Sequence, residues 1–152
     1  MSDERTDERL MRRALALAER ASEHGDVPIG AVVARGGEVL GEAGNERELR
    51  RDPTAHAEVL AMREAAERLG GWRLLETTLY VTLEPCPMCA GAITLARVPR
   101  LVYAAADPKG GAVGSVIDLF AEPVVNHRPA VEGGLLAGES SELLESFFSA
   151  RR

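Results

Sequence analysis

Two short motifs, each at the start of a predicted helix, are the strongest constraint on how this chain of 152 residues folds. They are His56-Ala57-Glu58 and Pro85-Cys86-Pro87-Met88-Cys89. Two cysteines three positions apart on a helix face the same way. The positive end of the helix dipole favours the thiolate, the form of cysteine that binds metal. Each motif follows a predicted strand or turn, so the two helices can begin at one edge of a sheet, where α/β proteins usually bind ligands.

The apolar periodicity predicts strands that alternate with helices. The expected elements are a helix over 7–24, a hairpin over 27–40, a helix over 53–69, a strand over 77–82, a helix from Pro85 to about Ala96, a strand over 101–105, a glycine-rich loop over 107–114, a short helix, a short strand near 124–125 and a helix over 139–150. This alternation predicts an α/β fold with three layers, α/β/α, around a mixed sheet of about five strands. Because the chain shows no repeat or linker, residues 1–152 are expected to form one domain.

The composition is typical of a soluble globular protein, with 45% hydrophobic and 28% charged residues. No apolar run approaches the ~20 residues that span a bilayer. The first ten residues, MSDERTDERL, lack the apolar region of a signal peptide. We therefore expect a cytoplasmic protein with no membrane partner. Thiols stay reduced in the cytoplasm, so the close cysteine pair favours metal binding or redox chemistry over a structural disulfide.

His56, Cys86 and Cys89 supply the three protein ligands that are typical of a catalytic zinc ion, whose fourth position holds water. Such an ion lowers the pKa of that water. Glu58 lies two residues after His56, about 200° round an ideal helix. It is expected to lean into the cavity from the helix tip and to act as general acid and base. A structural zinc site or a thioredoxin-like redox pair is the alternative.

The two motifs resemble the cytidine/deoxycytidylate deaminase superfamily, whose signature is His-x-Glu followed by Pro-Cys-x-x-Cys. Within it, the chain is most similar to the bacterial tRNA adenosine deaminases, from the first helix to Phe147-Phe148. The resemblance implies a cytidine deaminase-like fold, one zinc ion per chain and a homodimer. It also implies hydrolytic deamination of adenosine to inosine at the wobble position of a tRNA anticodon, with Glu58 as the catalytic residue. The similar stretches are residues 52–58, 80–92 and 107–115.

The resemblance also implies contacts to the substrate. Asn45 matches a purine-binding asparagine of the family, and Asp107 matches an aspartate near the sugar and backbone of the substrate. An apolar wall against the base is expected from three consecutive residues, Val27, Pro28 and Ile29.

Two further contacts are predicted from the residues themselves. Lys109 is the only lysine of the chain and stands in the glycine-rich loop, where it is expected to contact a phosphate. Phe147 and Phe148 lie about 100° apart on a helix. One of them is expected to pack inward, and the other to meet an unstacked base of the anticodon loop.

The net charge of −6 argues against a nucleic-acid-binding protein, since such domains are usually basic. A short single-stranded loop can nevertheless be recognised by stacking and pocket shape. A local basic rim is predicted from the uneven placement of the basic residues, which are Arg47, Arg50 and Arg51 before the His56 motif and Lys109, Arg128, Arg151 and Arg152 in or after later loops. The zinc motif is shared with deaminases of guanine, cytosine and deoxycytidylate, so a free-base or nucleotide deaminase is an alternative. A non-catalytic zinc-stabilised RNA-binding module is another, and it predicts that Glu58 is dispensable.

Overall fold

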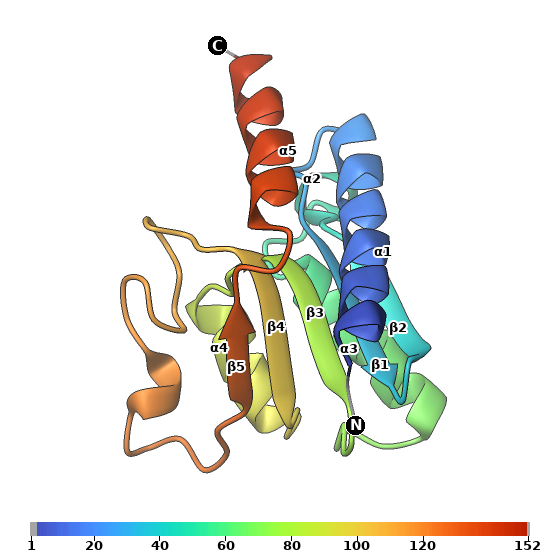
Figure 1. Cartoon of the computed structure of the whole chain (residues 1–152), viewed down its shortest axis with the longest axis vertical. Coiled ribbons are helices and arrows are strands. Elements are labelled where there is room, and N and C mark those ends of the chain that lie inside the picture. Colours follow the sequence, from blue (N-terminus) through green and yellow to red (C-terminus); the bar gives the residue numbers. More distant parts are fainter. Residues whose placement is uncertain (1–2, 152) are drawn as a thin grey trace.

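Five strands form one mixed sheet in the computed structural model, which describes residues 3–151. The elements along the chain are α1 (Glu4–Glu23), β1 (Gly30–Arg35), β2 (Glu38–Gly44), α2 (Arg47–Arg50), α3 (Ala57–Leu69), β3 (Thr78–Leu83), α4 (Pro87–Leu95), β4 (Arg100–Ala105), a short 3-10 helix (Leu119–Ala121), β5 (Ala130–Gly133) and α5 (Ala137–Ser149). The strand order is β2-β1-β3-β4-β5 (Figure 1). β1 is antiparallel to both β2 and β3, whereas β3, β4 and β5 are parallel.

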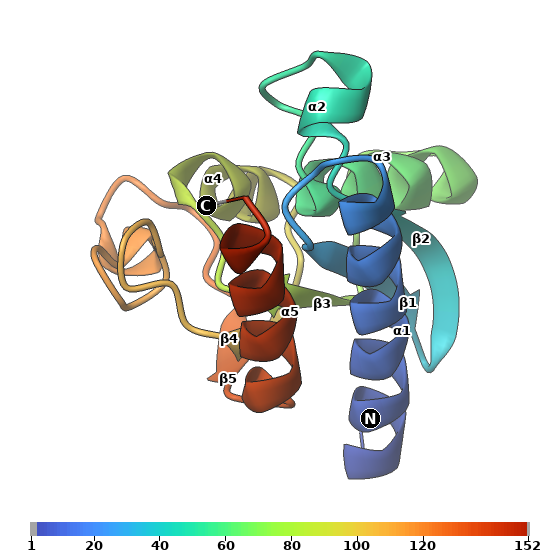
Figure 2. The ribbon, with the colours of Figure 1, turned by 90° about the horizontal axis from the view of Figure 1, so that it is seen from above.

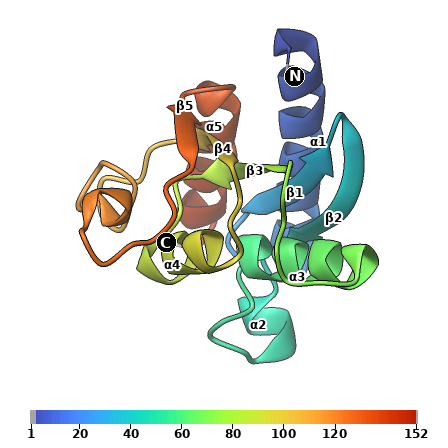
Figure 3. The ribbon, with the colours of Figure 1, turned by 90° about the horizontal axis from the view of Figure 1, so that it is seen from below.

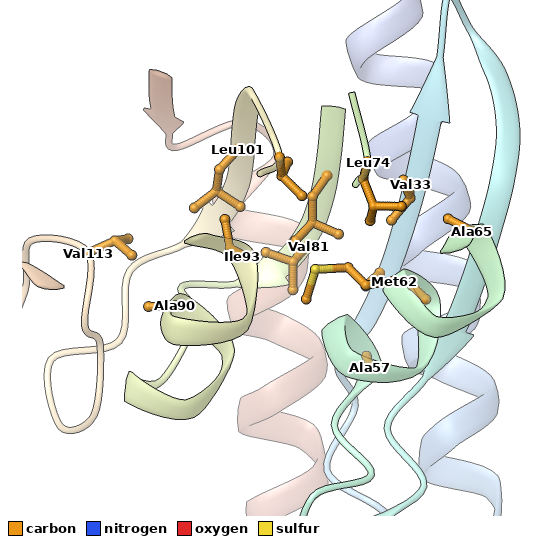
Figure 4. Packing of buried hydrophobic residues seen from close by; sticks show 14 of the residues in the cluster. Val33, Ala57, Met62, Ala65, Leu74, Val81, Ala90, Ile93, Leu101 and Val113 are labelled. Atoms are coloured by element: carbon orange, nitrogen blue, oxygen red, sulfur yellow. The ribbon is translucent and has the colours of Figure 1, made fainter. Parts of the chain in front are cut away.

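The central strands are apolar at consecutive positions because helices cover both faces of the sheet. Val33 and Val81 belong to the core on the side of α3 and α4, whereas Val32 and Tyr80 belong to the core on the side of α1. Figure 2 shows α1 and α5 on one face and α3 and α4 on the other. Figure 4 shows side chains of the α3 and α4 helices packed against the sheet. The predicted three-layer α/β/α arrangement with a mixed sheet is therefore confirmed.

The second predicted helix, over 53–69, is wrong at its start. The helix α3 begins at Ala57, and residues 51, 53 and 54 lie in turns. A side-chain oxygen of Asp52 accepts hydrogen bonds from the backbone N–H and the hydroxyl of Thr54, both at 2.8 Å, which stabilises a turn in place of a helical start. A short helix that the sequence did not predict, α2, precedes this turn and projects from the body beside α3 (Figure 3).

Two other predictions are corrected in the second half of the chain. Residues 124–125 form no strand, and Val124 is 82% exposed; the fifth strand is β5, at Ala130–Gly133. The helix expected to begin at Pro85 begins at Pro87, in the first turn, where the missing N–H of proline costs no hydrogen bond. The other predicted elements are present with small shifts at their ends. Within residues 3–151, no helix has both the length and the apolar character that crossing a membrane requires.

Candidate metal centre and substrate cleft

His56 and Cys86 occupy equivalent positions, because each is the extended residue that immediately precedes a helix. Cys89 lies in the first turn of α4 and is fully buried. Nδ1 of His56 is 3.6 Å from Sγ of Cys86 and 3.5 Å from Sγ of Cys89. The three candidate ligand atoms all lie within 4.8 Å of one another. The starts of α3 and α4 thus bring together the three residues that the sequence singled out.

These separations can be compared with those of a zinc site. Bond lengths of about 2.05 Å to nitrogen and about 2.3 Å to sulfur, in tetrahedral geometry, place the two ligand atoms about 3.5 Å apart. The His56–cysteine distances agree with this value. Two sulfurs and one imidazole nitrogen are also a donor set that suits zinc. The two His56–cysteine separations and the donor set therefore suit a zinc ion.

Hydrogen bonds among His56, Cys86 and Cys89 shift the pKa values of all three side chains. The hydrogen bond with Cys89, and then that with His56, lowers the pKa of the Cys86 thiol to about 4. The same bond to Cys86, together with burial, raises the pKa of Cys89. The bond to Cys86 also raises the pKa of the His56 imidazole. Negative charge is thus held on the sulfur of Cys86, and a thiolate is the form of cysteine that binds metal.

Glu58 lies in the first turn of α3 and is 4% exposed. Burial raises the pKa of its carboxyl to about 7, and its carboxyl is within hydrogen-bonding reach of Cys89. A carboxyl with a pKa near neutrality can both accept and return a proton at physiological pH. The expected angle of 200° between His56 and Glu58 does not apply, because His56 precedes the helix.

Asn45 is 6% exposed and connects two parts of the predicted base-binding wall. Its backbone N–H donates to the carbonyl of Ile29 at 2.9 Å, and its side-chain Nδ2 donates to the carbonyl of Val27 at 3.3 Å. Its Oδ1 accepts from the backbone N–H of Arg47 at 3.1 Å. Pro28, between the two carbonyls, is buried, while Val27 and Ile29 are half-buried. The amide nitrogen carries a second hydrogen, and its contact with a purine stays a prediction.

A cleft of about 660 Å³ gathers four of the predicted substrate residues. Phe148 of α5 lines it and is 48% exposed, whereas Phe147 is 8% exposed and carries the guanidinium of Arg151 at 3.5 Å from its ring centroid. The side chain of Asp107 accepts from the backbone N–H groups of Lys109 and Gly110, which shapes the turn at the rim. Contacts of these side chains with a substrate stay predictions. The residues that line the cleft are Val27, Leu83, Ala106, Asp107, Pro108, Lys109, Leu144, Glu145 and Phe148.

Comparison with known proteins identifies the family. The family model of the MafB19-like deaminases matches residues 5–152. The chain is 48% identical over 146 residues to a tRNA-specific adenosine deaminase of Bacillus subtilis, with 96% of this chain and 91% of the relative covered. It is also 48% identical over 147 residues to a tRNA-specific adenosine deaminase of Haemophilus influenzae, which covers 96% of this chain and 85% of the relative. The chain belongs to the family of the tRNA-specific adenosine deaminases.

Solved structures agree with this membership. A structure from work on A-to-I editing by tRNA:A34 deaminases at the wobble position superposes with a TM-score of 0.88 at 49% identity, covering 90% of this chain and 99% of the other. A guanine deaminase from Bacillus subtilis superposes with a TM-score of 0.65 at 35% identity, covering 95% and 92% of the two chains. The fold is thus shared with deaminases of free bases, whereas the higher identity is to the tRNA-specific enzymes.

Asp26 is a functional candidate of this deaminase that sequence reasoning missed. It is 1% exposed. One carboxylate oxygen accepts from the backbone N–H of Glu48 at 2.6 Å, and the other accepts from that of Leu49 at 3.1 Å. The second oxygen also lies 2.9 Å from Nδ1 of His24. These bonds tie α2 to the segment that carries the predicted base-binding wall.

The part of the predicted basic rim that lies on α2 is less basic than the sequence suggested, and Arg152 of that rim lies outside the described residues. The guanidinium of Arg50 pairs with the carboxylate of Glu46 at 2.7 Å, and Arg47 lies 4.0 Å from Glu48. Because these four side chains are paired as two ion pairs, the charge that α2 presents is smaller than a count of its arginines implies.

Glu84 is the second missed candidate in this deaminase, and it is 2% exposed at the end of β3. Oε1 accepts from the backbone N–H of Asp107 at 3.1 Å and from the hydroxyl of Ser115. Oε2 accepts from the backbone N–H groups of Val113 and Ser115, both at 3.1 Å. Burial acts to raise the pKa of Glu84, but these hydrogen bonds outweigh it and the pKa is lowered. The position of this glutamate next to Pro85-Cys86 is the signal that could have drawn attention to it.

Proposed function

We propose that this protein deaminates adenosine to inosine at the wobble position of a tRNA anticodon, with water as the second substrate and ammonia as the second product. The observation that carries the proposal is the meeting of His56, Cys86 and Cys89 at zinc-ligand distances beside the buried carboxyl of Glu58. The names and high identity of the relatives support adenosine in tRNA as the substrate.

His56, Cys86 and Cys89 would hold the zinc ion, which would supply a Lewis acid that makes water nucleophilic near neutral pH. Glu58 accepts one proton from the attacking water and delivers it to N1 of the adenine ring. It then takes the proton of the new C6 hydroxyl and passes it to the amino group, which leaves as ammonia. The same carboxyl thus serves as base and acid in turn, and its pKa of about 7 suits both steps.

The substrate side of the reaction is assigned to the residues predicted from the sequence. Asn45 would hydrogen-bond the purine, beside an apolar wall formed by Val27, Pro28 and Ile29. The cleft rim would hold the flanking nucleotides, with Asp107 near a sugar, Lys109 at a phosphate and Phe148 against an unstacked base. Phe147 would support Phe148 from within, since their ring centroids are 5.3 Å apart with the planes at 84°.

The anticodon loop of tRNA is the proposed partner, and a cytoplasmic location follows from such a substrate. We further propose that residues 1–152 act as a single zinc-dependent deaminase domain with one ion per chain. A homodimer is proposed on the resemblance alone, and sedimentation velocity would test it directly. A purely monomeric species at assay concentration would refute the dimer.

The decisive assay uses an anticodon stem–loop RNA with adenosine at the wobble position. Wild-type protein is expected to produce inosine. Glu58→Gln, which keeps the shape of the side chain but cannot carry the proton, is expected to lose activity by about 10²-fold or more. Zinc content per chain, measured by mass spectrometry of the metal, should be equal in the two proteins. Inosine production by Glu58→Gln at the wild-type rate would refute the mechanism.

Free guanine, free cytosine and deoxycytidylate are the control substrates, because a guanine deaminase is among the structural relatives. Turnover of guanine with no product from the stem–loop would replace the proposed substrate. Stem–loop binding without any product, in a protein that holds zinc, would identify a non-catalytic RNA-binding module.

A further inference from the structure

The loop of residues 107–115 is held by a single buried carboxylate. Glu84 accepts hydrogen bonds from three backbone N–H groups of this loop and from one hydroxyl. All four donors are uncharged. A carboxylate can accept about four hydrogen bonds, two at each oxygen, so the loop saturates it. The same loop carries Asp107 and Lys109 at the rim of the cleft.

The packing at Gly111 shows how closely the loop is fitted to this side chain. A Cβ atom at Gly111 would collide with the carboxylate of Glu84. The loop therefore passes directly over the carboxylate at a residue without a side chain. Two backbone hydrogen bonds also hold the segments on either side of this contact. The N–H of Ala112 donates to the carbonyl of Pro85 at 2.9 Å, and the N–H of Glu84 donates to the carbonyl of Ala105 at 2.8 Å.

Glu84 also lies two residues before Cys86, which precedes α4. Its backbone is thus continuous with the metal centre, while its side chain determines the path of the cleft rim. We propose that Glu84 is a positioning residue that sets the cleft rim relative to the metal centre, so that bound RNA presents its adenosine in register. This inference rests on the proposed function. Glu84 acts through the loop of residues 107–115 and does not itself contact the substrate.

Glu84→Gln is the most informative substitution, because it keeps size and shape while replacing one oxygen with an amide NH₂ group. If the NH₂ group faces Asp107, at least one backbone N–H loses its acceptor. If it faces Val113 and Ser115, two backbone N–H groups do. A buried N–H without an acceptor is costly, so the loop is expected to leave its wild-type path in either orientation.

The experiment compares wild type, Glu84→Gln and Glu67→Gln, the last being the same chemical change at an exposed position of α3. For Glu84→Gln we expect KM for the stem–loop RNA to rise about tenfold, with kcat within about threefold of wild type and zinc content unchanged. Hydrogen exchange at the amides of residues 107, 113 and 115 should accelerate. Glu67→Gln should match wild type in every measurement.

Ser115→Ala is a milder variant that removes only the hydroxyl donor, and it should give an intermediate rise in KM. It also tests the inference if Glu84→Gln does not fold. Unchanged amide exchange in Glu84→Gln, or a loss of kcat with a parallel loss of zinc at constant KM, would overturn the inference. A wild-type protein that leaves the stem–loop adenosine intact would instead refute the proposed function, whereas the exchange comparison would still report on the loop.

Discussion

Phe147 and Phe148, near the end of α5, are expected to have different roles, with Phe147 stabilising the fold and Phe148 binding RNA. Phe147 is 8% exposed, and Phe148 is 48% exposed at the cleft. Their rings meet edge to face at 5.3 Å. Replacing either with alanine removes this ring contact, worth about 0.5–1.5 kcal/mol. Only Phe147→Ala also empties a buried site, and such substitutions typically cost about 3–5 kcal/mol of unfolding free energy.

RNA binding should show the opposite order. Stacking of one base on an aromatic side chain contributes about 1–3 kcal/mol, which corresponds to a rise in Kd of roughly 5- to 150-fold. Phe148→Ala is therefore expected to bind the stem–loop this much more weakly while losing about 1 kcal/mol of stability. Phe147→Ala keeps the stacking ring and loses only its edge-to-face support, so at temperatures where it is folded it is expected to bind more tightly than Phe148→Ala.

Fluorescence anisotropy with a labelled stem–loop measures Kd, and urea denaturation measures the unfolding free energy. Phe148→Leu is the matched control, because it keeps apolar surface but has no π-face for a base. It should bind as weakly as Phe148→Ala. If Phe148→Ala and Phe147→Ala both bind with the wild-type Kd, no base stacks on this helix and the reasoning is wrong.

Removal of zinc by a chelator should abolish deamination, and addition of zinc should restore it; activity that survives in verified metal-free protein would contradict the proposed site. The logarithm of the binding constant should fall with the logarithm of salt concentration at a slope of about −1.4, because each single-stranded phosphate contact contributes about −0.7. Two such contacts are expected, from Arg51 and from Lys109, since Arg47 and Arg50 are already paired. A slope near −5 in a titration would show broader phosphate contact. Hydrogen bonds from Arg100 lower the pKa of Asp7 despite burial, so this pair stabilises the fold above the ordinary pKa of aspartate and the stability is lost as pH falls below it. Urea denaturation across pH 3–7 should therefore show a shallower acid loss in Asp7→Asn than in wild type.

The grouping of the three candidate metal ligands could be predicted from the sequence, because these residues are close to helix starts that the sequence also marks. Cys86 and Cys89 are separated by one helical turn, and proline marks the start of α4. His56 is distant from this cysteine pair in the sequence. The alternation of strands and helices nevertheless predicts that the two helices begin at the same edge of the sheet, which brings His56 to the cysteines. The sequence placed His56 inside the helix, whereas in the structure it immediately precedes α3; in both cases it lies at the same end of the helix.

The substrate side could not be predicted in the same way, because its geometry depends on hydrogen bonds between distant segments. Asp26 reaches the backbone of residues 48 and 49, and Glu84 reaches that of residues 107, 113 and 115. A single aspartate or glutamate in a sequence does not show whether it is exposed or buried against backbone N–H groups. The short helix α2 was missed for a similar reason, since a helix of four residues is too short for apolar periodicity.

The acidic charge of the chain bears on how an RNA could be selected. A broad basic surface attracts any RNA, because phosphate contacts carry little sequence information. Here the net charge is −6, and the two ion pairs on α2 reduce the positive charge near the metal centre. Affinity must then come mainly from an extruded base and its neighbours, held by pocket shape and by stacking. An RNA whose bases cannot unstack offers neither an extruded base nor a stacking partner. Because this chain attracts phosphates only weakly, it is expected to prefer a flexible anticodon loop over an RNA duplex.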